Sequence, residues 1–306
     1  MDKISVFSPA TVANVSCGFD AMAFALDNLG DEMTFKKTTN PSVCISKIQG
    51  AKLPFDSHKN VAGVVAKIML KDAEADFGVD IQILKNFKPG SGLGSSAASA
   101  AGTAYAIDKL LGCPYALIDL VKFAMQGEVV ACGSAIADNV AACLYGGFVL
   151  IRSYEPLDII NLPSPDLLRV SIIHPQIEIR TEDARRIIPE HLSLKTATTQ
   201  WANVGGLVSG LYESNYESIA NSLVDVVAEP YRKKFIPYFD DIKTAVLESG
   251  ALGVGISGSG PSMFALSKGI ETSTEVTNAM DSIYKNKGIE YNIHQSQIAK
   301  KGVRII

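Results

Sequence analysis

A glycine-rich segment carries the clearest chemical signal in the sequence. It follows an apolar stretch at 79–84 and runs directly into a predicted helix, in the order Pro89-Gly90-Ser91-Gly92-Leu93-Gly94-Ser95-Ser96-Ala97-Ala98. Glycines at alternate positions let the backbone approach a ligand closely, and Ser95 or Ser96 is expected to cap the helix. Several N–H groups then point outward from the helix start, an arrangement that binds phosphate. We therefore predict a phosphate-binding loop here; the alternative is a tight turn that only packs the helix.

Two better-known nucleotide motifs do not account for this segment. A Walker A loop requires a lysine after its last glycine, whereas Ser95 follows Gly94. The spacing Gly92-x-Gly94-x-x-Ala97 does satisfy the dinucleotide fingerprint. That motif also requires a second strand, ending in an acidic residue about 20 residues later. Residues 110–126 are predicted to be helical instead, so the dinucleotide-binding interpretation is disfavoured.

Polar residues from two other segments suit a phosphorylated ligand. Asn14 and Asp20 stand among small and apolar residues, where loop residues often contact a polar ligand. Glu128 ends a predicted helix with few charges. Its carboxylate and the Ser96 hydroxyl are oxygen ligands of the kind that Mg²⁺ takes beside nucleotide phosphates. Taken alone, Asp20 also fits a turn residue and Glu128 a solvated glutamate, so both predictions depend on the glycine-rich loop.

The elements that must position these residues mix strands and helices without a strict βαβ alternation. Strands are expected at 4–6, 32–36, 43–47, 79–84, 146–152, 168–174, 252–256, 263–267 and 292–297. Helices are expected at 60–71, from 95 onward, and at 115–126, 181–188, 196–211, 219–227 and 236–249, with a last one ending at 281–287. The glycine-rich segment 253–262 predicts a tight hairpin. The proline-rich stretch 153–165 is the best candidate for a domain boundary, and the fold class expected is α+β.

The composition and charge of the chain indicate which classes of protein it fits. The chain has 306 residues, of which 47% are hydrophobic and 20% charged, as in a folded globular protein with one or two domains. A net charge of −4 lacks the basic surplus of a nucleic-acid binder. No apolar stretch reaches the ~20 residues that a membrane span needs, and no signal peptide is recognised. The five cysteines form no C-x-x-C pair, which predicts reduced thiols in a cytoplasmic protein.

Taken together, the segments resemble one enzyme family. Residues 13–20, 89–98 and 253–262 resemble, in order, the three motifs of the GHMP kinases (galacto-, homoserine, mevalonate and phosphomevalonate kinases). Within that family the homoserine kinases are the most similar, through Thr181-Glu182-Asp183-Ala184-Arg185, Ala228-Glu229-Pro230-Tyr231-Arg232 and Ile256-Ser257-Gly258-Ser259-Gly260-Pro261.

The resemblance implies a two-domain α+β GHMP kinase fold with the active site at the domain junction. A ribosomal-protein-S5-like, ATP-binding N-terminal domain would cover 1–155 and a ferredoxin-like C-terminal domain 156–306. The implied activity is transfer of the ATP γ-phosphate to the hydroxyl of L-homoserine with Mg²⁺, a step of threonine biosynthesis, by a cytoplasmic homodimer. The alternative within the family is a mevalonate- or sugar-type substrate. A non-catalytic relative that binds nucleotide without turnover is a further alternative.

The same resemblance assigns roles to individual residues. The ATP-binding loop would comprise Lys88, Pro89, Gly90, Ser91, Gly92, Leu93, Gly94, Ser95, Ser96, Ala97 and Ala98. Mg²⁺ would be held by Ser96 and Glu128, and Lys85 would lie near the phosphates. The substrate pocket would comprise Asn14, Asp20, Arg185, Arg232 and Gly258, and the catalytic residues Asn139, Lys85 and Arg185. An amino acid requires a carboxylate for its ammonium group (Asp20) and a guanidinium fork for its carboxylate (Arg185 or Arg232).

Two departures and one open question accompany these assignments. Ile136 stands where the family usually has histidine, which implies that one substrate hydrogen bond is absent or supplied from elsewhere. Ser16 replaces a usual glycine in the first motif. Asp138 can be interpreted as a general base, or the reaction can proceed by alignment and charge neutralisation alone, because phosphoryl transfer has a loose transition state. We favour the second mechanism. Arg232 could also be a surface residue at a helix start, without a part in binding.

Overall fold

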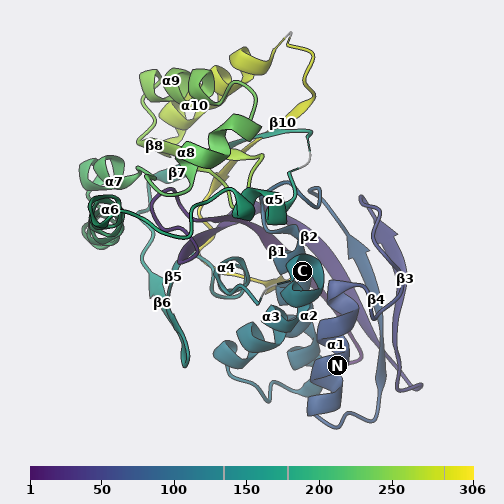
Figure 1. Cartoon of the computed structure of the whole chain (residues 1–306). Helices are drawn as coiled ribbons and strands as arrows, with labels where there is room; N and C mark the ends of the chain where they lie inside the picture. Colours follow the sequence, from purple (N-terminus) through teal and green to yellow (C-terminus); the bar gives the residue numbers. More distant parts are fainter. Residues whose placement is uncertain (134, 178, 286) are drawn as a thin grey trace.

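Two β-sheets form the framework of the computed structural model, which describes residues 1–133, 135–177, 179–285 and 287–306 (Figure 1). The first sheet has the order β11-β1-β2-β4-β3, with β5 pairing with β2 and β6 with β5. Its strands are β1 (Lys3–Ala13), β2 (Met22–Thr38), β3 (Val43–Gln49), β4 (Gly78–Leu84), β5 (Phe148–Tyr154), β6 (Leu157–Leu162) and β11 (Arg304–Ile305).

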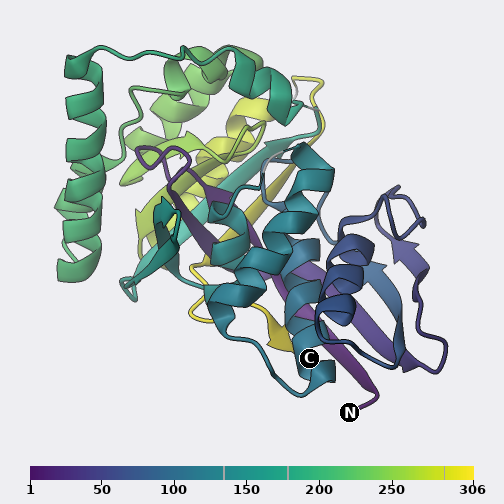
Figure 2. The same cartoon turned by 60° about the horizontal axis from the view of Figure 1, so that its bottom comes forward.

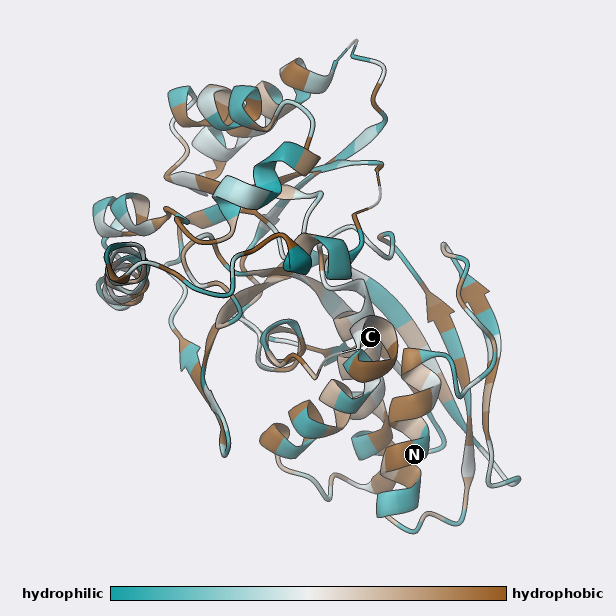
Figure 3. Ribbon diagram, in the orientation of Figure 1, coloured by the Kyte–Doolittle hydropathy of each residue, from teal (hydrophilic) through white to brown (hydrophobic). Residues whose placement is uncertain are grey.

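Four helices pack together beside this sheet (Figures 1 and 2). They are α1 (Val61–Asp72), α2 (Ser95–Leu111), α3 (Leu117–Cys132) and α4 (Asp138–Tyr145). The central helix, α2, contacts β1, β2 and the other three helices. Its small residues Ala97, Ala98, Ala100 and Ala101 are fully buried, which lets the neighbouring elements approach closely. Hydrophobic residues are also prominent on α1 (Figure 3).

The second sheet has the strand order β10-β7-β9-β8 and is entirely antiparallel. Its strands are β7 (Leu168–Pro175), β8 (Gly253–Ile256), β9 (Met263–Lys268) and β10 (Tyr291–Gln297). The helices α9 (Phe239–Glu248) and α10 (Ile270–Tyr284) pack on it around a separate hydrophobic cluster that includes Ile173, Ile242 and Met280. This is the strand order of a ferredoxin-like unit.

Within this second unit, a helical segment connects β7 to α9. It contains α5 (Thr181–Arg186), α6 (Leu194–Glu213), α7 (Tyr216–Ser222), α8 (Glu229–Arg232) and a 3₁₀ turn at Lys233–Phe235. In Figure 1, α5 lies near the junction of the two halves and α6 stands at the outer side of the molecule. The sheets are also in contact, through β2 with β10 and through the rings of Phe24 and Phe264, whose centroids are 5.9 Å apart.

The expected fold class is confirmed: two units of mixed helix and sheet, with a helix (α3) following α2 where a dinucleotide fold requires a strand. Most expected elements are present, including the hairpin of β8 and β9. The proposed division at 155/156 stays a prediction; the hairpin of β5 and β6 spans it. Among the described residues, no helix is long and apolar enough to cross a membrane.

Two predictions about helices are wrong, and one strand was missed. The cap of α2 is Gly94, and no side chain caps this helix, so neither Ser95 nor Ser96 plays that part. The segment 153–165, the best candidate for a domain boundary, contains strand β6, which was not predicted from the sequence. The helix expected at 219–227 is α7, which begins at Tyr216 and ends at Ser222; the residues after it are held by Asp225, which accepts the backbone N–H groups of Val227, Ala228 and Glu229 at 2.8 to 2.9 Å.

Candidate active site

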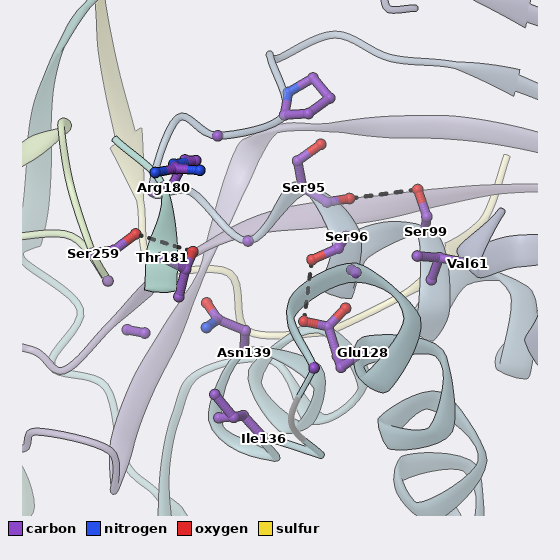
Figure 4. A pocket seen from close by; sticks show the side chains of 18 of the residues that line it. Val61, Ser95, Ser96, Ser99, Glu128, Ile136, Asn139, Arg180, Thr181 and Ser259 are labelled. Atoms are coloured by element: carbon purple, nitrogen blue, oxygen red, sulfur yellow. Dashed lines mark hydrogen bonds between the residues drawn. The ribbon is translucent and has the colours of Figure 1, made fainter. Parts of the chain in front are cut away.

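A cavity of about 770 Å³ opens between the two halves of the molecule (Figure 4). From the N-terminal half it is lined by Asn14, Gly94 and Glu128, and from the C-terminal half by Arg185 and Arg232. Residues far apart in the sequence therefore meet here, where the resemblance implies that the active site lies.

The glycine-rich loop takes a conformation that needs its glycines. Gly90, Gly92 and Gly94 have φ angles of 75°, 80° and 70°, in the left-handed region that side chains disfavour. A Cβ on Gly92 would lie 2.5 Å from the carbonyl oxygen of Ser257, and one on Gly94 would lie 2.1 Å from Oγ1 of Thr11. The loop thus fits tightly against its neighbours and leads directly into the N-terminus of the 17-residue helix α2, where N–H groups are available to an anion.

The hairpin of β8 and β9 supports this loop from the other half of the chain. Ser257 donates its hydroxyl hydrogen to the carbonyl of Gly92 at 2.7 Å, and the N–H of Ser262 donates to the carbonyl of Ser91 at 3.3 Å. The sequence predicts a hairpin that can approach a ligand or another loop, and these two hydrogen bonds are with the glycine-rich loop.

Lys85 lies beneath the start of α2. It is buried, and its ammonium group forms an ion pair with Asp31, which is also fully buried. It donates further to the carbonyl of Ser95 at 2.8 Å and to Oγ of Ser99 at 3.2 Å. An ammonium group has three N–H donors, so these partners use all of them. Lys85 anchors the first turn of α2, and its expected place beside the phosphates stays a prediction.

Ser96 and Glu128 are brought together as expected. The Ser96 hydroxyl donates to Oε2 of Glu128 at 3.1 Å, and both residues line the cavity (Figure 4). Burial raises the pKa of Glu128 to about 7, with a smaller contribution from Asp138. A hydroxyl and a carboxylate are hard oxygen ligands that fit Mg²⁺, and a cation at this place would offset the cost of burying the charged carboxylate. Two side chains leave most of its coordination to phosphate oxygens and water, the usual situation for Mg²⁺.

Asp138 and Asn139 begin α4 on the cavity wall. Burial raises the pKa of Asp138 to about 6. Its Oδ1 accepts hydrogen bonds from the N–H of Asn139 at 2.6 Å and from Nδ2 of Asn139 at 3.1 Å. The other end of the Asn139 amide, Oδ1, accepts from the hydroxyl of Thr11 at 2.6 Å. Sequence reasoning missed Thr11, although it lies three residues before Asn14.

The predicted partners of a substrate amino acid meet at the mouth of the cavity, but two of them pair with each other. Arg185 donates from Nη1 and Nη2 to the two carboxylate oxygens of Asp20, at 2.8 and 3.0 Å. Both side chains are partly exposed. Asn14 fixes the turn before them, because its Oδ1 accepts the N–H of Asp20 at 3.1 Å and its Nδ2 donates to the carbonyl of Gly258 at 2.9 Å.

Arg232 is buried, with 4% of its surface exposed, so the interpretation of Arg232 as a surface residue is wrong. Its Nε donates to the carbonyl of Ala184 at 3.0 Å and its Nη1 to the carbonyl of Gly258 at 2.9 Å. Burial lowers the pKa of Arg232 to about 10, which leaves it cationic at neutral pH. Gly258 therefore accepts from both Asn14 and Arg232, and joins the two sides of the pocket.

Sequence reasoning also missed an apolar part of the cavity. Leu53, Pro54, Val61 and Val130 line it. In Figure 4, Val61 lies on the opposite side of the pocket from Arg180, Thr181 and Ser259. The only signal was the start of α1, where Asn60 caps the helix by accepting the N–H of Ala62.

Comparisons with known proteins identify the family to which this chain is similar. The model of the GHMP kinase N-terminal domain matches residues 60–147, and that of the C-terminal domain matches residues 207–286. The homoserine kinase of Chlorobium phaeobacteroides (strain BS1) is 44% identical, over the whole of both chains. The crystal structure of homoserine kinase from Cytophaga hutchinsonii is 47% identical, with a TM-score of 0.96 over 100% of this chain and 98% of that chain.

This chain belongs to the homoserine kinase branch of the GHMP kinases. The family and fold expected from the motifs are thereby confirmed, and the chain is an ATP-dependent kinase with a small-molecule substrate. An L. major mevalonate kinase in complex with R-mevalonate shares the fold alone with this GHMP kinase, at a TM-score of 0.72 and 14% identity over 95% of each chain.

Proposed function

We propose that this kinase transfers the γ-phosphoryl group of ATP to the hydroxyl of L-homoserine, in the cytoplasm, as a step of threonine biosynthesis. The observation that carries the proposal is one cavity that is lined by the glycine-rich loop before α2 and also by Asp20, Arg185 and Arg232. A carboxylate and guanidinium groups are the partners that an α-amino acid needs. A mevalonate or galactose molecule has no ammonium group for Asp20 to bind.

ATP would occupy the side of the cavity that the glycine-rich loop borders. The phosphates would accept hydrogen bonds from N–H groups of the loop and of the first turn of α2. The apolar residues Leu53, Pro54 and Val61 would contact the base. Lys88 is exposed beside the loop and would add positive charge near the phosphates.

Ser96 and Glu128 would hold Mg²⁺ against the phosphates. When bound there, the ion would neutralise charge that develops on the transferred group. The chain's own contribution is to fix both oxygen donors: α2 presents Ser96 at its second residue, and α3 presents Glu128 in its last turns. The hydrogen bond between them shows that they reach the same point of the cavity.

Homoserine would bind with its ammonium group at Asp20 and its carboxylate at Arg232 and Arg185. Since Arg185 pairs with both oxygens of Asp20 in the described structure, the substrate must open or bridge this pair. Arg232 is held more firmly by two carbonyl groups, and no acceptor in the described ranges bonds to its Nη2. That Nη2 is the donor available to a carboxylate.

Alignment, rather than a general base, would carry the transfer step. Asn139 would contact the reacting hydroxyl, and an amide cannot remove a proton. The hydroxyl proton leaves late in a loose transition state, so positioning and charge neutralisation suffice.

Asp138→Asn is expected to retain substantial kcat, within about 100-fold of the wild-type value, because no base is lost. Initial rates of ADP release at saturating substrates measure this. A fall beyond about 10³-fold in a folded variant would instead identify Asp138 as the base, since general bases contribute 10²–10⁴-fold.

The substrate assignment is tested by incubating the protein with ATP and Mg²⁺ and, separately, homoserine, mevalonate, galactose or shikimate. ADP release only with homoserine is expected. Preference for another alcohol would replace homoserine by that substrate, and nucleotide binding without ADP release would support the non-catalytic alternative.

We also propose that the kinase forms a homodimer through helix α6. Six residues of α6 recur at alternating intervals of four and three, and we call them the α6 stripe: Leu194, Thr198, Trp201, Gly205, Val208 and Tyr212. Leu194, Trp201 and Tyr212 are 75%, 57% and 60% exposed. The helix carries only two charged residues, Lys195 and Glu213, one at each end and of opposite sign. An antiparallel second copy fits this pattern, since unlike charges then meet and Trp201 faces Gly205 of the partner subunit.

Trp201→Lys is expected to weaken the dimer by about 30-fold or more, because it buries a charge at the centre of the interface. Sedimentation over a range of protein concentrations measures the dissociation constant. Thr199→Lys, a change at another exposed position on the other side of the same helix, should leave the dissociation constant within about threefold. A monomeric wild-type protein, or equal effects of both changes, would contradict the α6 interface.

A further inference from the structure

The backbone of Thr11 contacts the glycine-rich loop. It lies in β1 immediately after a register shift in the pairing of β1 with β2, and it is fully buried. Its N–H donates to the carbonyl of Leu93 at 3.0 Å. The position of β1 therefore fixes the middle of the loop, two residues before helix α2 begins.

The side chain of Thr11 contacts Asn139, which lines the cavity. Its hydroxyl donates to Oδ1 of Asn139 at 2.6 Å. A Cβ on Gly94 would lie 2.1 Å from Oγ1 of Thr11 and 3.0 Å from Oδ1 of Asn139. Gly94, Thr11 and Asn139 are therefore in direct contact, so a displacement of one of them displaces the other two.

These contacts decide which way the Asn139 amide faces. Its two ends are nearly equal in size, so hydrogen-bond partners determine the orientation. An ionised Asp138 can only accept, and it takes a hydrogen from Nδ2. Thr11 donates to the other end, which must then be Oδ1. Among the described residues no second acceptor bonds to Nδ2, so its other hydrogen is available to the cavity, which Asn139 lines.

We infer that Thr11 is a positioning residue for phosphoryl transfer: its hydroxyl orients the Asn139 amide toward the reacting hydroxyl, and its N–H holds the phosphate loop at a fixed place relative to that amide. The inference rests on the proposed function, in which Asn139 contacts the hydroxyl that receives the phosphoryl group. Thr11 itself contacts neither ATP nor homoserine. It acts by keeping the glycine-rich loop, which would bind ATP, and Asn139, which would contact the substrate hydroxyl, in fixed positions relative to each other.

A double-mutant cycle on the full-length protein tests this inference. Thr11→Val keeps the shape, the β-branch and the backbone N–H but removes the hydroxyl. We expect kcat to fall about 10- to 100-fold while both KM values stay within about threefold, because misplacement of a catalytic group costs rate more than binding. Thr11→Ser, which keeps the hydroxyl, should recover kcat to within about threefold of wild type.

The decisive measurement is the same change in the Asn139→Ala background. If Thr11 acts through Asn139, Thr11→Val should alter kcat there by less than about twofold, because residues that act as a unit are not additive. An equal fall in both backgrounds, or a raised KM for ATP with unchanged kcat, would overturn the inference, since either result shows only a packing role. An unaltered kcat in Thr11→Val would also overturn it.

Thermal unfolding midpoints accompany every variant, and Thr11→Ala replaces Thr11→Val in the cycle if the valine variant does not fold. The wild-type rate tests the proposed function separately. If wild type prefers another alcohol, homoserine is the wrong substrate and the cycle is run on that alcohol. If wild type phosphorylates homoserine but the cycle is additive, the inference alone fails.

Discussion

Replacing Glu128 by glutamine is expected to reduce kcat by roughly 10²–10³-fold, the scale of losing one charged ligand of a catalytic cation. Glutamine has the same size and keeps an oxygen toward Ser96, so the packing around this buried residue changes little. What is lost is the negative charge that would hold Mg²⁺ beside the phosphates. The measurement is the rate of ADP release with homoserine as a function of Mg²⁺ concentration.

The Mg²⁺ titration separates a ligand from a structural role. If Glu128 is a ligand, high Mg²⁺ should restore part of the Glu128→Gln rate, whereas a folding defect would not respond. Since burial raises the pKa of Glu128 to about 7, the neutral glutamine should not lower the unfolding midpoint of the free protein. Glu190→Gln, the same change at an exposed position, should leave the rate unaltered. Equal rates for Glu128→Gln and wild type at every Mg²⁺ concentration would contradict this assignment.

Local signals in the sequence were sufficient for much of the fold. Strand β4 alternates apolar and polar residues, and α1 carries an apolar face after a capping asparagine, so both were predicted closely. The glycine-rich loop was predictable because its chemistry is contiguous: the three left-handed glycines and the helix that follows lie within a few residues of one another.

Elements whose pattern depends on distant partners were not predictable. Strand β2 pairs with β5 at Met22–Phe24 and with β4 at Glu32–Thr38, and Asp27 and Asn28 between them are exposed. Its alternation is therefore interrupted, and only the part at 32–36 was recognised. Helix α4 has only eight residues and six of them are buried, so the segment is too short for a helical period to be recognised.

The sequence also could not show which side chains of the site are paired with other residues of the chain. A lysine at the end of a strand can point to a phosphate or to a buried carboxylate, and only Asp31, which is distant in the sequence, decides that Lys85 is paired. The same holds for Asp20, which is predicted to bind an ammonium group and in the described structure pairs with Arg185. The residue types indicated the ligand, whereas tertiary contacts determine which groups are available to it.

Arg232→Leu is expected to raise KM for homoserine by about 30- to 1,000-fold, with KM for ATP nearly unchanged. This corresponds to about 2–4 kcal/mol, the loss when one partner of a buried charge-assisted pair is removed. Arg232 is buried and held by Ala184 and Gly258, so its guanidinium is already in place before substrate arrives. Leucine would present an apolar side chain to the substrate carboxylate and leave that charge without its partner.

Arg186→Leu is the matched control, because Arg186 is exposed and pairs only with Asp183 among the described residues. Its KM for homoserine should stay within about threefold, as for a surface ion pair. Arg232→Lys keeps the charge but not the planar fork, so its KM should lie between those of wild type and Arg232→Leu. An unchanged KM for ATP shows that a variant is folded. If Arg232→Leu also leaves KM for homoserine unchanged, the carboxylate is bound elsewhere, and the buried arginine serves only to join α5 to the β8–β9 turn.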